Sequence, residues 1–261
     1  MRQFFLATDP AALPQPGDRV TLDRDESHHL LGVMRGAGDR DWCLVDGRGN
    51  RFSARMAGQG GHPHGGRLAE VEILGAERDP REDDGPRLTL ACAVVKGRHF
   101  DLVVEKAVEL GAHRLLPLVT ARGVIEPGEG RRARWEALMR AALKQCGRSC
   151  LPHLDDPLDL AAALTACGGD HLYVGAAPDE RALVGDGARP VSTASFSAPP
   201  VFLALFIGPE GGWTPDEARR LAAAGARPLD LGPFTLRTET AAIVGLGALR
   251  ALAVGCPWPG S

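Results

Sequence analysis

Short apolar runs alternate with stretches of helical spacing in the second half of the chain. Residues 87–95 form one apolar run, residues 100–110 repeat apolar side chains every three to four positions, and residues 114–119 form a second apolar run. The runs are typical of buried strands, and the spacing is typical of one face of a helix. A strand, a helix and another strand in this order predict a βαβ unit of a mostly parallel sheet.

The same alternation continues to the C-terminal end. Residues 201–207 form a further apolar run, and Thr214-Pro215 reads as an N-cap followed by proline at the first helical position. We therefore predict an α/β domain over residues 87–261. Its further elements are expected strands over residues 172–174, 201–207 and 228–231, and expected helices over residues 131–145, 160–164, 217–224 and from 238 onward.

The first part of the chain has a different pattern. Strand-like runs separated by Gly and Asp cover residues 19–23, 41–46, 51–57 and 67–74, and one helix that Ser27 can cap interrupts them. Several short strands with one helix predict a small β-barrel over residues 1–76. Residues 77–86 are charged, contain Pro and Gly and lack other apolar side chains, so they are the predicted linker.

Composition excludes several classes of protein. The net charge of −3 argues against a protein that coats nucleic acid by bulk attraction. The six cysteines form no CxxC pair, so we expect no metal site. No apolar run is long enough to span a bilayer, and the N-terminus lacks the architecture of a signal peptide, so we expect a cytoplasmic protein and no membrane partner.

Glycine-bearing loops follow two of the expected strands. Gly-Pro-Glu-Gly-Gly occupies residues 208–212, and Gly-Pro occupies residues 232–233. Either loop alone is most often an ordinary turn. Loops at the carboxyl ends of strands in an open α/β sheet also form the usual ligand crevice. Neither loop matches the common nucleotide motifs, so the residues by themselves do not identify the ligand. They indicate only a crevice for a small molecule.

The two loops together carry a family resemblance. Ile-Gly-Pro-Glu-Gly-Gly at residues 207–212, followed by Leu-Gly-Pro-x-x-Leu-Arg-Thr-Glu-Thr-Ala at residues 231–241, resembles the C-terminal signature of the RsmE family. The resemblance implies a SPOUT methyltransferase with a trefoil knot, preceded by a PUA-like domain that binds RNA. It also implies S-adenosylmethionine as cofactor, N3 of a uridine in 16S ribosomal RNA or the small ribosomal subunit as substrate, and a homodimer.

Other segments extend the resemblance over almost the whole chain. Residues 28–35 resemble the HHLxxVLR element of the family's N-terminal domain, residues 96–117 its opening motif, and residues 145–148 its EQxxR element. Two departures are notable: Ala121 stands where the family usually has Glu, and Phe234 stands where it usually has Arg.

The resemblance and the chemistry of methyl transfer assign roles to side chains. Uridine N3 must lose its proton before it can attack, so a base and a cation are expected. Arg237 stays protonated and is assigned anion stabilisation or phosphate anchoring. Glu239 is the candidate base or base-orienting group, Glu210 the second candidate, and Arg122 a further catalytic candidate. Equally, Glu239 is an acid that the helix dipole favours in a first turn.

The remaining candidates bind cofactor or RNA. The expected cofactor residues are Gly175, Ala176, Ile207, Gly208, Pro209, Glu210, Gly211, Gly212, Leu231, Gly232, Leu236, Arg237, Thr238, Thr240 and Ala241. The expected RNA-binding residues are Arg2, His29, Arg35, Arg51, Lys96 and Arg148.

Two alternatives remain at this point. The chain is compatible with a SPOUT methyltransferase that acts on another RNA, such as transfer RNA. A non-catalytic RNA-binding protein is the alternative from a different class, and the intact Arg-Thr-Glu-Thr at residues 237–240 argues against it.

Overall fold

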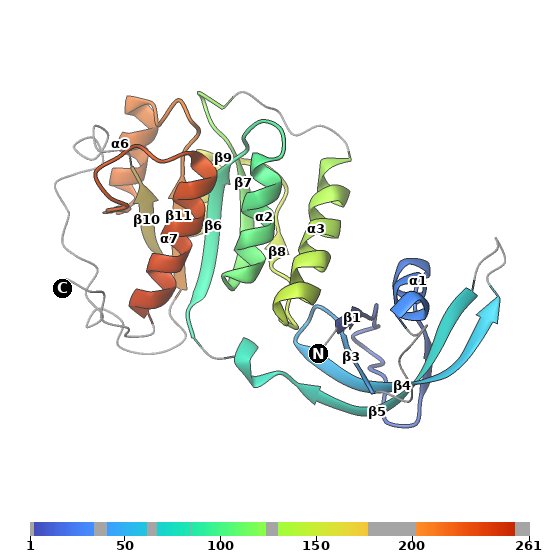
Figure 1. Cartoon of the computed structure of the whole chain (residues 1–261). Helices are drawn as coiled ribbons and strands as arrows, with labels where there is room; N and C mark the ends of the chain where they lie inside the picture. The colour runs from blue at the N-terminus through green and yellow to red at the C-terminus, as the bar shows by residue number, and fades with distance from the viewer. Residues whose placement is uncertain are drawn as a thin grey trace. The chain divides into compact units, whose positions relative to one another are not determined.

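The computed structural model describes residues 3–33, 41–61, 67–83, 85–123, 130–176 and 202–253 (Figure 1). Contacts divide the chain into two compact units. The N-terminal unit comprises Met1–Asp83 and Arg140–Leu151, and the C-terminal unit comprises Asp84–Met139 and Pro152–Ser261. The boundary at Asp83 lies inside the predicted linker of residues 77–86, whereas the prediction that residues 140–151 belong to the C-terminal domain differs from this division.

The N-terminal unit contains a five-stranded mixed sheet in the order β1-β3-β4-β5-β2. β1 is parallel to β3, and the other neighbours are antiparallel. The described pairings form an open path from β1 to β2, and a closed barrel remains a prediction. Its elements are β1 (Gln3–Phe5), β2 (Arg19–Thr21), α1 (Arg24–Val33), β3 (Trp42–Val45), β4 (Asn50–Gly61) and β5 (Arg67–Arg78).

One apolar core forms between this sheet and α1. Phe4, Leu30, Trp42, Phe52 and Ile73 are among its fully or almost fully buried members. They come from α1 and from four strands: β3, β4 and β5 coincide with predicted strand-like runs, whereas β1 was not predicted. The sheet bends at irregularities in the β4–β5 register, between Ser53 and Ala54 and between Met56 and Gly58.

The expected helix cap at Ser27 is wrong. Ser27 lies inside α1 and is fully buried, where its hydroxyl donates to Leu22 O and accepts from Ala69 N. Asp23 caps the helix instead, because its carboxylate accepts a hydrogen bond from Glu26 N at 2.8 Å. Ser27 therefore joins α1 to β5 rather than starting the helix.

The C-terminal unit is built on a seven-stranded sheet in which every described pair of strands is parallel. The order is β12-β10-β11-β6-β7-β8, with β9 paired to β7. This confirms the predicted α/β fold, whereas the knot remains a prediction. The strands are β6 (Arg87–Ala93), β7 (Ala112–Val119), β8 (His153–Leu154), β9 (Leu158–Asp159), β10 (His171–Gly175), β11 (Phe202–Ile207) and β12 (Arg227–Leu229).

Helices cover both faces of this sheet. α2 (His99–Glu109) and α7 (Thr238–Ala253) pack against each other and against β6, β7 and β11. α4 (Leu160–Ala166) and α6 (Pro215–Ala223) share a core with alternate residues of the strands, including Ala204 and Phe206 of β11. Alternation is expected because successive side chains of a strand point to opposite faces. No helix in the described ranges is long and apolar enough to cross a membrane.

Helix α3 (Arg131–Cys146) is divided between the two units. In its first half, the Trp135 ring packs on Phe100 with a centroid distance of 4.7 Å. In its second half, the Arg140 guanidinium lies 5.1 Å from the centroid of the Phe5 ring, and Lys144 forms an ion pair with Glu26. The contacts of Arg140 and Lys144 explain why residues 140–151 group with the N-terminal unit.

Residues 79–82 of the predicted linker belong to a buried ionic network within the N-terminal unit. β5 continues to Arg78, and the short 3₁₀ helix η1 (Pro80–Glu82) follows. The buried Glu82 carboxylate accepts from Arg148 Nη2 at 2.9 Å and from the backbone N–H groups of Ser149 and Cys150. The buried Asp79 carboxylate accepts from Arg81 Nη2 at 2.7 Å and from Ser149 Oγ at 3.0 Å.

Both carboxylates are held in the charged form. The hydrogen bond from Arg81 keeps the pKa of Asp79 well below its usual range, although burial acts in the opposite direction. Burial raises the pKa of Glu82, but the hydrogen bond and charge of Arg148 and the two backbone N–H groups outweigh it, so the pKa is lowered. The two charged carboxylates thus bind segment 79–82 to residues 148–150 through an ion pair and hydrogen bonds.

We predict that Glu82→Gln lowers the free energy of unfolding by about 3 kcal/mol, because it leaves Arg148 buried beside a neutral partner. The matched control is Asp41→Asn, which breaks a half-exposed ion pair with Arg55 in the same unit and should cost less than about 1 kcal/mol. Urea unfolding measures both variants.

The pH dependence follows from the sign of the Glu82 shift. Because the folded pKa lies below the usual value of 4.5, the stabilisation is present above pH 4.5 and declines as pH falls through the folded pKa.

Equal losses of unfolding free energy in the Glu82→Gln and Asp41→Asn variants would contradict a special role for the buried pair of Glu82 and Arg148.

Candidate active site

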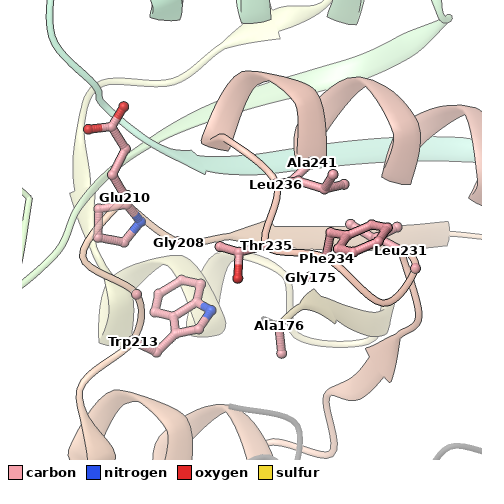
Figure 2. A pocket seen from close by; sticks show the side chains of 13 residues that line it. Gly175, Ala176, Gly208, Glu210, Trp213, Leu231, Phe234, Thr235, Leu236 and Ala241 are labelled. Carbon is pink, nitrogen blue, oxygen red and sulfur yellow. The ribbon is translucent and has the colours of Figure 1, made fainter. Parts of the chain in front are cut away.

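The end of β10 and the loops after β11 and β12 meet at the carboxyl edge of the parallel sheet and form a pocket. β10 contributes Gly175 and the adjoining Ala176, and the pocket holds about 530 Å³ of empty space, its open mouth included. Figure 2 shows Trp213, Thr235 and Ala176 around this space, with Glu210 towards one end and Phe234 towards the other. The lining residues are Gly175, Ala176, Gly208, Pro209, Glu210, Gly212, Trp213, Leu231, Gly232, Phe234, Thr235, Leu236 and Ala241.

Two of the glycines are required by close packing. A Cβ atom at Gly175 would lie 2.6 Å from Ile207 Cδ1, and a Cβ atom at Gly208 would lie 2.9 Å from the indole of Trp213. Neither position has room for a side chain. The backbone at the ends of β10 and β11 is therefore the pocket surface itself, as backbone recognition of a ligand requires.

The loop after β11 is held in place by Arg122. Its guanidinium Nη1 donates to Gly211 O at 2.8 Å and to Trp213 O at 3.3 Å. Gly212 adopts a φ of +69°, which favours glycine. Arg122 therefore supports the shape of this loop through its carbonyl groups, and it is absent from the pocket lining.

Helix α6 starts directly after this loop with the predicted cap. Thr214 caps the helix as the Thr-Pro pattern predicted, and it also forms a capping box with Glu217. Glu217 Oε1 accepts a further hydrogen bond from Ala121 N at 2.9 Å. The family usually has Glu at position 121, and here the carboxylate of Glu217 binds the backbone of that turn. The sequence offers Glu126 as another carboxylate for this task, and Glu126 lies outside the described residues.

The start of α7 joins the loop after β11 to the loop after β12. Thr238 is buried, and its hydroxyl donates to Gly208 O at 3.1 Å. Arg237, which precedes it, is exposed and has no side-chain partner among the described residues. Its guanidinium is therefore available to a bound anion beside the pocket-lining Leu236.

Glu239 forms a pair with a histidine of another helix. His99 Nδ1 lies 3.0 Å from Glu239 Oε1; the glutamate side chain is 8% exposed and the histidine side chain 48% exposed. The second oxygen, Oε2, is buried and has no hydrogen-bond partner in the described part of the chain. Burial and the nearby Glu239 carboxylate also raise the pKa of Cys92 far above its usual value. Glu239 does not line the pocket, so His99 is the group that its carboxylate can orient directly.

Most predicted cofactor residues line the pocket, and five do not. Ile207 is buried behind Gly175, Thr238 acts through Gly208 O, and Gly211, Arg237 and Thr240 face solvent. Sequence reasoning did not select Trp213, Phe234 and Thr235 for the pocket. They were detectable only from their places next to the glycine motifs.

The predicted RNA-binding residues have varied surroundings. Arg2 and Arg35 lie outside the described residues. His29 is exposed and its ring packs on Phe4 with a centroid distance of 5.2 Å, whereas Lys96 is exposed and has no side-chain partner in the described ranges. Arg51 and Arg148 are engaged by Asp79 and Glu82, respectively.

Comparison with known proteins gives a consistent result. A family profile for the RNA methyltransferase domain matches residues 83–250. Ribosomal RNA small subunit methyltransferase E of Mycobacterium bovis is 32% identical over 253 residues, which cover 92% of this chain and 89% of that protein.

Two solved structures are similar along nearly their full length. A putative methyltransferase from Legionella pneumophila with bound S-adenosylmethionine has a TM-score of 0.78 at 28% identity and covers 95% of this chain and 96% of its own. Ribosomal RNA small subunit methyltransferase E from Neisseria gonorrhoeae, also bound to S-adenosylmethionine, has a TM-score of 0.77 at 26% identity. The match covers 97% of this chain and 98% of that protein. The chain therefore belongs to the RsmE family of ribosomal RNA small subunit methyltransferases.

Proposed function

We propose that this protein transfers a methyl group from S-adenosylmethionine to N3 of a uridine in 16S ribosomal RNA. The observation that carries the proposal is the pocket formed by the end of β10 and the loops after β11 and β12 in an RNA methyltransferase fold. Relatives named for small-subunit ribosomal RNA support the choice of RNA, and the family resemblance supports uridine N3.

The lining of the pocket suits an adenosyl cofactor. Backbone groups at Gly175 and Gly208 can meet the edge of an adenine or a ribose, while Ala176, Leu231 and Leu236 supply apolar contact. The neighbours solved with S-adenosylmethionine support this assignment.

The chain's own groups must align the nucleotide and manage its charge. When bound, S-adenosylmethionine supplies a methyl carbon made electrophilic by the sulfonium. The N3 lone pair forms the new C–N bond as the C–S bond breaks, and the N3 proton leaves to a base. We assign Arg237 to stabilising the developing uracil anion, because it is exposed beside the pocket and always charged.

The geometry favours Glu210 over Glu239 as the proton acceptor. Glu210 lines the pocket and its carboxylate is exposed, whereas the Glu239 carboxylate is buried and paired with His99. Glu239 is better placed as an orienting group at the start of α7. Arg122 supports the loop that carries Glu210.

Location and assembly complete the proposal. The substrate implies a cytoplasmic protein that meets 16S ribosomal RNA or the small ribosomal subunit. We also propose a homodimer, since α7 buries Leu246 and Leu249 in the core and leaves Val244 41% exposed on another side. The molar mass from light scattering tests the dimer.

The test of the function is methyl transfer followed by mapping of the product. Purified protein, labelled S-adenosylmethionine and 16S ribosomal RNA, free or in small subunits, should give one labelled N3-methyluridine. Transfer only to transfer RNA would establish a different substrate. Cofactor binding without transfer to any RNA would contradict the enzymatic proposal.

We predict that Gly232→Leu weakens binding of S-adenosylmethionine at least tenfold, because the new side chain projects from the pocket wall. Gly225→Leu is the matched control: both glycines have positive φ, +108° and +80°, and a Cβ at either meets nothing within 4 Å. Both variants therefore carry similar backbone strain, and only Gly232 lines the pocket. Calorimetric titration measures the affinity of both variants for S-adenosylmethionine. Equal affinities would show that the cofactor binds elsewhere.

We predict that Arg237→Ala reduces kcat for methylation about 100-fold while the Kd for S-adenosylmethionine changes little, as for loss of one charge-stabilising donor. Glu210→Gln should also lower kcat, because it removes the proposed proton acceptor. If Arg237→Ala lost only cofactor affinity, the guanidinium would support the loop rather than the reaction.

A further inference from the structure

Three exposed cations stand at the N-terminal ends of two neighbouring helices. Lys96 and Arg98 immediately precede α2, and Arg237 immediately precedes α7. None of the three has a side-chain partner among the described residues. We name this set the α2–α7 cation surface.

Ten other arginines in the described ranges are each paired with a carboxylate of their own unit, so their charge is largely neutralised within the protein. These pairs are Arg51 and Arg81 with Asp79, Arg55 with Asp41, Arg78 with Asp83, Arg114 with Asp155, Arg132 with Glu136 and Asp156, Arg134 with Asp101, Arg148 with Glu82, and Arg219 and Arg220 with Asp216.

The two helix ends are held next to each other. α2 and α7 lie side by side in the C-terminal unit (Figure 1), and His99 of α2 meets Glu239 of α7 at 3.0 Å. Lys96 and Arg98 are within three residues of His99, and Arg237 is two residues from Glu239. Since each residue spans at most about 3.6 Å, Lys96 and Arg98 lie within about 11 Å of His99, and Arg237 lies within about 7 Å of Glu239.

Neighbouring acids do not cancel this charge. Glu239 is buried and paired with His99, and the Asp101 carboxylate accepts from Arg134 Nε at 3.1 Å. In addition, the N-cap residue Arg98 makes no side-chain capping hydrogen bond, so the first N–H groups of α2 add to the positive potential. The area is therefore a net anion-attracting surface in a chain whose net charge is −3.

The position of Arg237 connects this surface to the pocket. Arg237 follows Leu236 and lies four residues before Ala241, and both of these line the pocket. An RNA strand that delivers a base to the pocket has phosphates on either side of that base. Cations next to the pocket can bind these phosphates and so position the RNA. Such contacts do not recognise the base sequence.

We propose that Lys96 and Arg98 bind the RNA phosphates that flank the target nucleotide, with Arg237 at the border between this surface and the pocket. This proposal rests on the proposed RNA methyltransferase activity and assigns a substrate-holding role to the C-terminal unit itself. Lys96 was already a predicted RNA-binding residue, and Arg98 is added to that set here. Sequence reasoning had no basis for selecting Arg98, because the contact between α2 and α7 is visible only in the structure.

The test compares two double variants with equal loss of charge. Lys96→Ala with Arg98→Ala removes the proposed contacts, and Arg219→Ala with Arg220→Ala removes two exposed cations of α6. Binding of a 16S ribosomal RNA fragment is measured across a series of KCl concentrations. The first variant should bind at least tenfold more weakly at low salt, and its slope of log K against log salt should be shallower by about 1.4, at about 0.7 for each single-strand phosphate contact.

Two further measurements separate this proposal from the function on which it rests. The Lys96 and Arg98 variant should keep the wild-type Kd for S-adenosylmethionine and raise KM for RNA more than it lowers kcat. If its salt slope matched the wild type, or if the Arg219 and Arg220 variant lost as much affinity, the surface would not bind phosphate, whatever the enzyme's activity. Failure of the wild type to methylate RNA would refute the function instead.

Discussion

The candidate site depends on the close approach of backbone at the ends of β10 and β11. Gly175 packs against Ile207, and Gly208 packs against the Trp213 indole, with no room for a Cβ atom at either position. Parallel pairing brings these two strand ends to the same edge, and β12 adds a further loop on the far side of β10. The hydroxyl of Thr238 then binds Gly208 O, so the start of α7 is fixed relative to the pocket.

This constraint divides the residues around the pocket into those that support the loop after β11 and those that can act on a ligand. Arg122 and Thr238 bind carbonyl groups of the loop after β11, and their loss would change its shape. Glu210 and Arg237 remain exposed to a ligand. Glu239 belongs to neither group alone: it is buried, yet its His99 partner reaches solvent and links the two helix ends that carry the α2–α7 cation surface.

Local patterns predicted the parallel domain well, because apolar runs and capping residues are local signals. The Thr214 cap and the glycine loops are examples. The pattern failed where partners are distant in sequence: Ser27 is held by Ala69, and the charged segment 79–82 reads as a linker until Arg148 and Ser149 are brought to it. The pairing of Glu239 with His99, 140 residues away, was beyond any local signal for the same reason.

The central claim is that the end of β10 and the loops after β11 and β12 hold the cofactor. A crystal structure of the protein with S-adenosylhomocysteine tests it most directly. We expect the adenosyl group between Gly175, Gly208 and Leu231, with the sulfur turned toward the side of the pocket that carries Glu210. Well-ordered ligand bound anywhere else in the chain, with these loops left empty at saturating ligand, would contradict it.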